Sequence, residues 1–193
     1  MPHIAIVDCY DSFVYNIVEY ARNVASTEID VIPCKAIDAK RINFRTTYDG
    51  IILSPGPGHP LELPLLSTII HQAETTYTPL LGICLGMQAI ACTYGASLIN
   101  LQKPLHGHAE RLCDCLADDP FIYEGQLVAR YHSWIVDTAT LPSALECTAY
   151  AQSDHSPMAL RHKQYPFYGT QFHPESYITQ HGFEIIKNWI ESL

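Results

Sequence analysis

Short apolar runs alternate with segments of helical character through the first half of the chain. The runs that predict buried strands are residues 4–8, 29–33, 50–54 and 79–84. The segments that predict helices are residues 11–24, 65–74 and 87–95. Asp11 or Ser12 is the expected cap of the first helix. Strands that alternate with helices in this way are typical of a parallel sheet, so we expect an α/β fold with a mostly parallel central sheet flanked by helices.

The pattern changes in the second half of the chain. Between about residues 106 and 171 the apolar runs are short, rich in β-forming residues, and separated by Pro, Asp and Ser. Residues 126–137, 144–151 and 157–162 predict antiparallel or mixed strands. The segment 182–193 predicts an amphipathic final helix. We therefore expect a smaller, β-rich, mixed or antiparallel part after the parallel sheet.

Length and charge narrow the class of protein. The 193 residues fit one domain, which we assign to residues 1–193. Twenty acidic residues against eleven basic ones give a net charge of −9, which argues against a nucleic-acid partner. No apolar run approaches the roughly 18 residues of a membrane helix, and the N-terminus lacks a secretory pattern. With seven cysteines, an odd number without framework spacing, we expect a reduced, cytoplasmic protein without a membrane partner.

A cysteine between two glycines follows the fourth predicted strand. Gly82-Ile83-Cys84-Leu85-Gly86 fits the nucleophile-elbow pattern, with Cys in the place of Ser. The small neighbours permit a tight turn that lifts the sulfur above the carboxyl edge of the sheet. The turn also puts Cys84 at the start of a helix, whose partial positive charge favours the thiolate. The alternative is a buried cysteine beside two packing glycines.

One of the ten histidines, His173, is followed two positions later by Glu175. Side chains at i and i+2 of an extended segment point to the same side, and Pro174 stiffens the link. A carboxylate beside an imidazole fixes its tautomer and stabilises the imidazolium. His173 then suits the acid that protonates a departing amine and the base that activates water. The alternative is a solvent-exposed His–Glu pair without a catalytic role.

Glycines after the third predicted strand supply a second candidate feature. In Gly56-Pro57-Gly58, the proline has no N–H, so an oxyanion donor must be Gly56 or Gly58. We favour Gly58, paired with the N–H of Leu85. Metal is not expected, because the one-residue gaps in the candidate ligand pairs do not match zinc spacings. Those pairs are Cys113 with Cys115 and His106 with His108.

Five motifs are spread over essentially the whole chain: DSFVYN at 11–16, SPGPGHP at 54–60, GICLGMQ at 82–88, RYHSW at 130–134 and GTQFHPES at 169–176. In order and spacing they resemble those of the triad-type (class I) glutamine amidotransferases. The resemblance implies a mostly parallel α/β fold and a triad of Cys84, His173 and Glu175. It also implies a glutamine pocket, without cofactor or metal, that is lined by Gly56, Gly58, Gln88, Ser133 and Trp134.

Within this family the first and last motifs are most similar to the small subunits of anthranilate synthase and aminodeoxychorismate synthase. The resemblance implies a subunit that hydrolyses L-glutamine and delivers ammonia to a large chorismate-binding synthase subunit. The sequence leaves open which of the two synthases, or both, it serves. Two other functions remain as alternatives: a stand-alone cysteine hydrolase of γ-glutamyl substrates, and a non-catalytic subunit that activates a synthase.

Three positions depart from the pattern of the chorismate branch. Met87 stands where His is frequent, His108 where Lys is usual, and Trp134 where a smaller aliphatic residue is usual. None of them is a triad residue. We expect His108 to affect contact with the partner and Trp134 to reshape the pocket wall.

Overall fold

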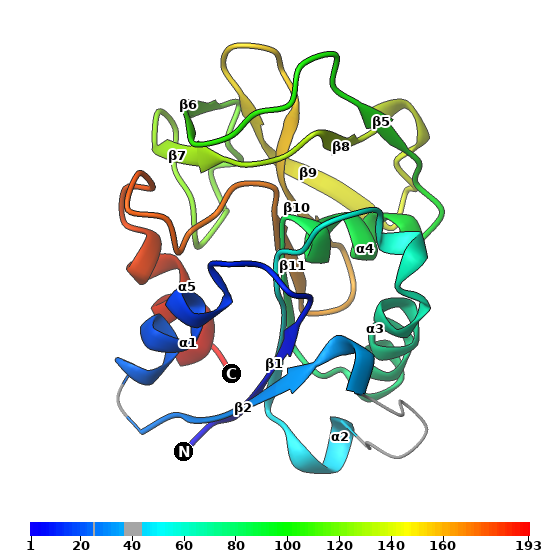
Figure 1. Cartoon of the computed structure of the whole chain (residues 1–193), viewed down its shortest axis with the longest axis vertical. Coiled ribbons are helices and arrows are strands. Elements are labelled where there is room, and N and C mark those ends of the chain that lie inside the picture. Colours follow the sequence, from blue (N-terminus) through cyan, green and yellow to red (C-terminus); the bar gives the residue numbers. More distant parts are fainter. Residues whose placement is uncertain (25, 37–43) are drawn as a thin grey trace.

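One large mixed sheet dominates the fold of the computed structural model, which describes residues 1–24, 26–36 and 44–193 (Figure 1). Among these residues, nine strands pair in the order β2-β1-β3-β4-β11-β10-β9-β6-β7. A separate two-stranded sheet pairs β5 with β8. The strands are β1 (His3–Asp8), β2 (Glu28–Pro33), β3 (Gly50–Leu53), β4 (Leu80–Ile83), β5 (Leu98–Asn100), β6 (His108–Cys113), β7 (Leu127–Arg130), β8 (Trp134–Val136), β9 (Leu145–Ala151), β10 (Pro157–His162) and β11 (Phe167–Thr170).

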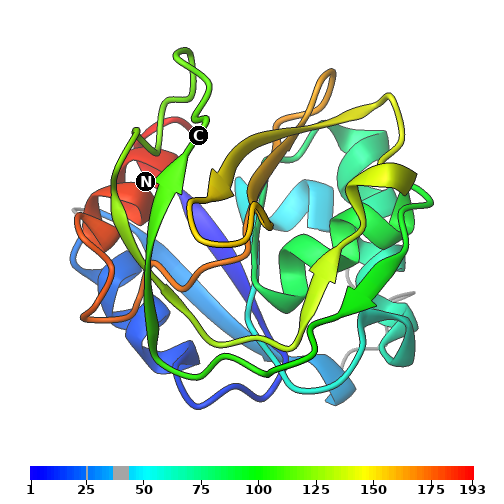
Figure 2. The ribbon, with the colours of Figure 1, turned by 90° about the horizontal axis from the view of Figure 1, so that it is seen from above.

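The large sheet is parallel from β2 to β11 and antiparallel from β11 to β7. The α/β class and the mostly parallel centre are therefore confirmed. The β-rich second half is joined to the parallel half edge to edge, because β10 pairs with β11 and β11 pairs with β4. Figure 2 shows from above how the antiparallel strands curve away from the parallel ones.

Helices cover both faces of the parallel half (Figures 1 and 2). One face carries α1 (Val14–Arg22) and α5 (Gly182–Glu191), and the other carries α3 (Pro64–Thr76) and α4 (Leu85–Thr93). The shorter helices are η1 (Cys34–Ala36), α2 (Phe44–Thr47), η2 (Pro60–Glu62) and η3 (Thr138–Thr140).

Strand β1 is apolar at successive positions and does not alternate between apolar and polar residues. Ile4 and Ile6 pack in the core under α1 and α5, whereas Ala5 and Val7 pack in the core under α3 and α4. All four side chains are buried because successive residues of a strand face opposite sides and helices cover both sides here.

The structure corrects several element boundaries. Helix α1 begins at Val14 after an N-cap Phe13, so neither Asp11 nor Ser12 is the cap. The Asp11 carboxylate instead accepts a hydrogen bond from the Phe13 N–H, which forms a turn just before the helix. Helix α4 begins at Leu85, two residues earlier than expected, because Cys84 itself is the N-cap.

The predicted strand at 126–137 is interrupted. It divides into β7 and β8, and the three residues between them turn the chain from the large sheet to the small one. The pattern did not predict β5, nor β11 as a parallel neighbour of β4.

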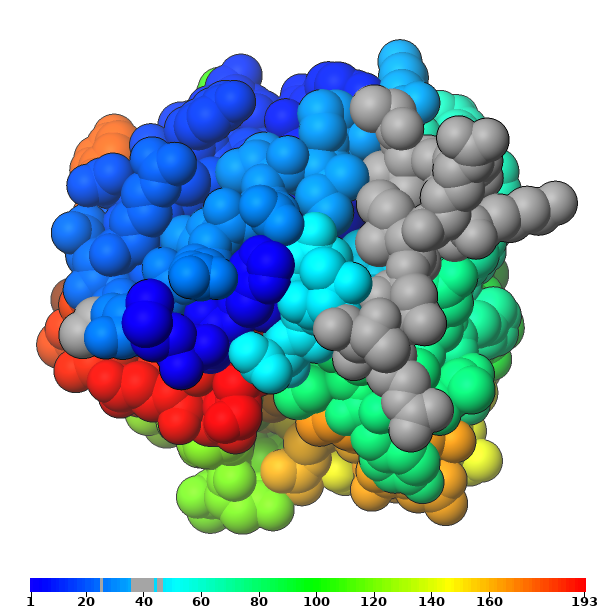
Figure 3. Space-filling view, turned by 90° about the horizontal axis from the view of Figure 1, so that it is seen from below, coloured from blue at the N-terminus to red at the C-terminus, as the bar shows by residue number. Residues whose placement is uncertain are grey.

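The two ends of the chain lie on one side of the molecule. Figure 3 shows this side, with the first residues next to the C-terminal helix α5. Among the described residues, no helix is both long enough and apolar enough to cross a membrane.

Candidate active site

Three neighbouring strands end at the same edge of the sheet, and each leads into a predicted site segment. In the strand register, Leu53 of β3 pairs with Gly82 of β4, and Ile83 of β4 pairs with Thr170 of β11. Because these strands are parallel, the segments that follow them meet at one edge. These segments contain the glycine loop 56–58, Cys84 and His173. Residues up to 117 positions apart in the sequence, from Gly56 to His173, therefore belong to one site.

Cys84 occupies a strained turn between β4 and α4. Its φ of 51° and ψ of −101° lie outside the regions that side chains favour, and its residue surface is 6% exposed. Both flanking glycines are required by close contacts. A Cβ on Gly82 would lie 2.5 Å from the Gly86 carbonyl carbon, and a Cβ on Gly86 would overlap the Leu53 carbonyl oxygen. The elbow that the sequence predicts is present.

His173 and Glu175 form a buried pair beside this turn. The His173 Nδ1 and the Glu175 Oε1 are 2.7 Å apart, and the two side chains are 1% and 0% exposed. The solvent-exposed alternative for this pair is therefore wrong. Backbone contacts fix the segment, because the His173 N–H donates to the Ala129 carbonyl of β7 at 3.0 Å. The Thr179 hydroxyl also donates to the His173 carbonyl at 2.6 Å.

The charge state of His173 follows from its neighbours. Burial by itself lowers the pKa of His173, but the negative charge of Glu175 and the adjacent Cys84 thiol outweigh it and hold the pKa well above 6.5. The Nε2 atom of His173 is buried and makes no hydrogen bond to the described residues. With Nδ1 engaged by Glu175, Nε2 is the atom that is free to exchange a proton at the Cys84 side.

A cleft of about 160 Å³ opens over Cys84. This volume is small compared with sites for drug-sized ligands. The lining residues are Gly56, Pro57, Gly58, Cys84, Gln88, Tyr131, His132, Ser133 and Trp134. Thus all the residues that we expected around glutamine, apart from Leu85, line this cleft. Leu85 is the first residue of α4, where an N–H has no acceptor within the helix.

Aromatic rings enclose His173. The Tyr131 ring lies 5.1 Å from the His173 ring, and the Phe13 ring lies 6.2 Å from it. Across the cleft, the Trp134 ring meets the His59 ring edge to face at 5.2 Å. Trp134 therefore connects the start of β8 to the residue after the glycine loop.

Sequence reasoning missed the roles of four polar or aromatic side chains. Phe13, Tyr131, His132 and Gln171 lie in the quoted motifs, yet no role was assigned to them. The Gln171 Nε2 donates to the Cys84 Sγ at 3.4 Å. The motif positions were a signal that these residues are near the site, but their contacts depend on how distant segments meet.

Two other cysteines, Cys113 and Cys115, lie among acidic groups. All seven cysteines are free. Burial and the charge of Glu124 raise the pKa of Cys115 to about 12, which suppresses its thiolate. Cys113 lies near Asp114 and His155, with the three possible ligand atoms within 4.8 Å of one another. Neither His106 nor His108 belongs to that group of the described residues.

The comparisons with known proteins agree with this geometry. The family profile described as Glutamine amidotransferase class-I matches residues 5–193. The chain belongs to the class I glutamine amidotransferases.

Similar proteins from three organisms extend this result. The chain is 36% identical over 191 residues to the anthranilate synthase component 2 of Azospirillum brasilense, covering 97% of this chain and 94% of that one. It is 38% identical over 194 residues to the aminodeoxychorismate/anthranilate synthase component 2 of Bacillus subtilis, covering 98% and 96%. It is also 37% identical over 195 residues to the bifunctional protein TrpGD of Thermotoga maritima, where the match covers 98% of this chain but spans only 32% of that protein.

A solved structure from Thermoplasma acidophilum, described as that of a GMP synthase subunit, has the same fold. Its TM-score is 0.84 at 25% sequence identity, and the match covers 99% of this chain and 93% of that one.

Proposed function

We propose that this chain, as one glutaminase domain over residues 1–193, hydrolyses L-glutamine with Cys84, His173 and Glu175. The observation that supports this most strongly is the pairing of His173 Nδ1 with Glu175 while Nε2 stays unpaired next to the Cys84 thiol. This is the arrangement in which a cysteine nucleophile has a base, and the base has an orienting carboxylate.

In the first half of the reaction, the Cys84 thiolate attacks the side-chain amide carbon of glutamine. The negative charge that moves onto the amide oxygen is held by the N–H groups of Gly58 and Leu85. The C–N bond then breaks, and His173 gives its Nε2 proton to the departing nitrogen, which leaves as ammonia. The product on the enzyme is a thioester between Cys84 and the glutamyl group.

In the second half, His173 takes a proton from water, and the resulting hydroxide attacks the thioester carbon. The C–S bond breaks, Cys84 returns to the thiolate, and glutamate is released. Glu175 stabilises the imidazolium at both stages without reacting itself. Gln88, Ser133, Trp134 and Gly56 line the glutamine pocket in this assignment.

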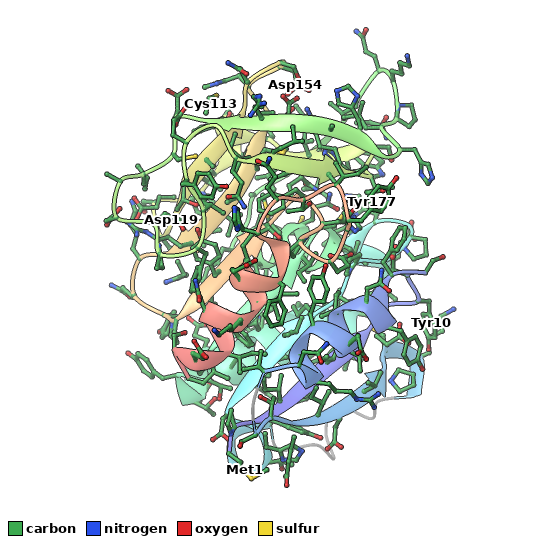
Figure 4. The ribbon with its side chains drawn as sticks, turned by 90° about the vertical axis from the view of Figure 1, so that its left-hand side faces the viewer. Met1, Tyr10, Cys113, Asp119, Asp154 and Tyr177 are labelled. Atoms are coloured by element: carbon green, nitrogen blue, oxygen red, sulfur yellow. The ribbon has the colours of Figure 1, made fainter. Side chains whose placement is uncertain are left out.

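The proposed acceptor of the ammonia is a large, chorismate-binding synthase subunit. Support comes from the names of the relatives in Azospirillum brasilense and Bacillus subtilis. Exposed aromatic side chains also suit a partner, because Tyr10 and Tyr177 are 46% and 92% exposed and lie toward the same side of the molecule (Figure 4). Aromatic residues are enriched at interfaces. We place the assembly in the cytoplasm, where thiols such as Cys84 stay reduced.

We further propose that the partner controls the glutaminase. Gly58, with φ of 84°, lies in a loop whose glycines can change backbone geometry, and the loss of one oxyanion donor costs about 100- to 1,000-fold in rate. A partner that binds the competent loop geometry more tightly would raise the rate by that route.

The test measures glutamate release by the purified chain alone, and then with chorismate and the large subunit of either synthase. We expect a low rate alone, a higher rate in the complex, and anthranilate or aminodeoxychorismate as the product that identifies the pathway. Full activity alone, unchanged by either large subunit, together with cleavage of γ-glutamyl peptides, would instead favour a stand-alone hydrolase.

A further inference from the structure

A continuous network of buried and partly buried hydrogen bonds leads from Arg130 to the sulfur of Cys84. The Arg130 Nε lies 3.1 Å from the His132 Nε2, and the His132 Nδ1 lies 3.1 Å from the Trp134 carbonyl oxygen. The same carbonyl lies 2.9 Å from the Gln88 Nε2, which is also 3.0 Å from the Gln171 Oε1. The Gln171 Nε2 then contacts the Cys84 Sγ at 3.4 Å.

The first part of this hydrogen-bond network, from Arg130 to Trp134, fixes the tautomer of His132. An arginine guanidinium only donates hydrogen bonds, so the His132 Nε2 must accept and its Nδ1 must carry the proton. Burial and the charge of Arg130 lower the pKa of His132 to about 3, which keeps the ring neutral with that single proton. His132 Nδ1–H therefore donates to the Trp134 carbonyl.

The second part fixes the orientation of both glutamine amides. The Trp134 carbonyl only accepts, so the Gln88 atom that faces it is the NH₂ group. That group donates its second hydrogen to Gln171, whose facing atom must then be the carbonyl oxygen. The Gln171 NH₂ group is left facing Cys84, because reversing it would set two donors against each other and an oxygen against the sulfur.

Acidic residues hold Arg130 at the end of the hydrogen-bond network that is farthest from Cys84. Its guanidinium donates to Glu110 at 3.0 Å and to Asp154 at 2.9 Å, and its side chain is 1% exposed. Asp154 lies at the end of the molecule near Cys113 (Figure 4). These ion pairs engage the two terminal nitrogens of the guanidinium and fix its plane. The single N–H of Nε then donates toward His132.

We propose that Gln171 is the hydrogen-bond donor that stabilises the Cys84 thiolate, and that Arg130 is a positioning residue that holds His132 against the Trp134 carbonyl, the acceptor that orients both amides. The proposal rests on Cys84 being the nucleophile. A donor to the charged form of a thiol favours that form, and here the donor is a buried amide with no freedom to reverse.

The groups that titrate around this sulfur are few among the described residues. His173 faces it from the segment after β11, with the carboxylates of Glu175 and Asp11 grouped around the imidazole. Tyr131 and His132 line the same cleft, and His132 is neutral. The thiolate thus has two sources of stabilisation, the imidazolium of His173 and the amide of Gln171, and only the second is connected to Arg130 through these hydrogen bonds.

The experiment measures the rate at which iodoacetamide alkylates Cys84 as a function of pH, followed by mass spectrometry of the Cys84 peptide. Gln171→Met removes the donor and puts an unbranched apolar side chain of similar length in its place. We expect the alkylation pKa of Cys84 to rise by about one or two pH units. The exposed Gln102→Met is the matched control, and it should leave the profile unchanged.

A second variant covers the case in which Gln171→Met does not fold. Arg130→Lys keeps a positive charge beside Glu110 and Asp154 but removes the N–H that is directed at His132. We expect a smaller rise of the Cys84 alkylation pKa in the same direction, which a purely structural role would not produce. A folded Gln171→Met or Arg130→Lys protein with the wild-type profile would overturn the proposal.

This readout is separate from glutamine hydrolysis. If Cys84→Ala retained glutaminase activity, the function proposed above would fail, whereas the alkylation profile would still report whether Gln171 stabilises the thiolate.

Discussion

The backbone N–H of Cys84 donates a hydrogen bond of 2.7 Å to the carbonyl oxygen of Thr170. This bond connects the turn that holds the nucleophile to the last residue of β11, three positions before His173. The spacing of the proposed nucleophile and base is therefore set by the pairing of two parallel strands, β4 and β11. Strand pairing is a rigid support, and the reaction requires it because the Cys84 sulfur and the His173 ring must be closely aligned.

Replacing Glu175 by Gln tests whether this residue orients and stabilises the base rather than reacting. The charge of Glu175 raises the pKa of His173, so Glu175→Gln should lower that pKa and reduce the imidazolium fraction near neutral pH. We expect kcat for glutamate release to fall, but by less than in Cys84→Ala. Steady-state kinetics of both variants checks this. A folded Glu175→Gln protein as inactive as Cys84→Ala would give the carboxylate a larger role.

The buried neutral ring of His132 predicts a pH dependence of stability. The pKa of His132 is about 3 in the folded chain and near 6.5 when unfolded, so the unfolded state binds the extra proton first. This site therefore costs the fold nothing above pH 6.5 and destabilises it progressively as pH falls toward 3. His173 acts in the opposite sense, because its raised pKa adds stability that is present below 6.5 and lost as pH rises through the folded value.

Urea unfolding of wild type and His132→Asn at pH 7 and pH 5 isolates the His132 effect. We expect the wild type to lose more stability than the variant between these pH values, at roughly 1.4 kcal/mol for each unit below 6.5. Equal losses in the two proteins would mean that His132 is protonated in the fold, and the hydrogen-bond direction argued from Arg130 would not hold.

Gly86→Ala tests the close packing of the elbow. The added Cβ would overlap the Leu53 carbonyl oxygen, so the turn that carries Cys84 must shift. A misplacement of about 1 Å costs about 100-fold in kcat. Gly125→Ala is the control, because Gly125 has a φ of 76° yet open space around its Cβ, so the substitution adds backbone strain away from the site. Circular dichroism and glutaminase assays should find Gly125→Ala active. An equally active Gly86→Ala protein would contradict the assigned packing.

Local patterns in the sequence were sufficient for much of this account. The strands β1 to β4, the glycines around Cys84 and the Pro174-stiffened pair of His173 and Glu175 are features of short segments, and each has a physical reason within a few residues. The order of the strands is different. That β11 lies beside β4 depends on pairing between residues about 87 positions apart, such as Ile83 and Thr170, which no local pattern encodes.

The polar chain behind the nucleophile was beyond sequence reasoning for the same reason. Gln88 meets Gln171 across 83 positions and the Trp134 carbonyl across 46. The direction of each hydrogen bond follows only when all the partners are known, because an amide alone can face either way. The contact of the Trp134 ring with the His59 ring likewise joins residues 75 positions apart.

The most direct test of the central claim compares glutamine with ammonia as the nitrogen source for synthesis by the complex of Cys84→Ala with the large subunit. If Cys84 is the nucleophile that releases ammonia, the variant complex should form product from ammonium salts at the wild-type rate and should form none above background from glutamine. Glutamine-dependent synthesis at the wild-type rate by Cys84→Ala would contradict the account and would favour a non-catalytic, activating subunit.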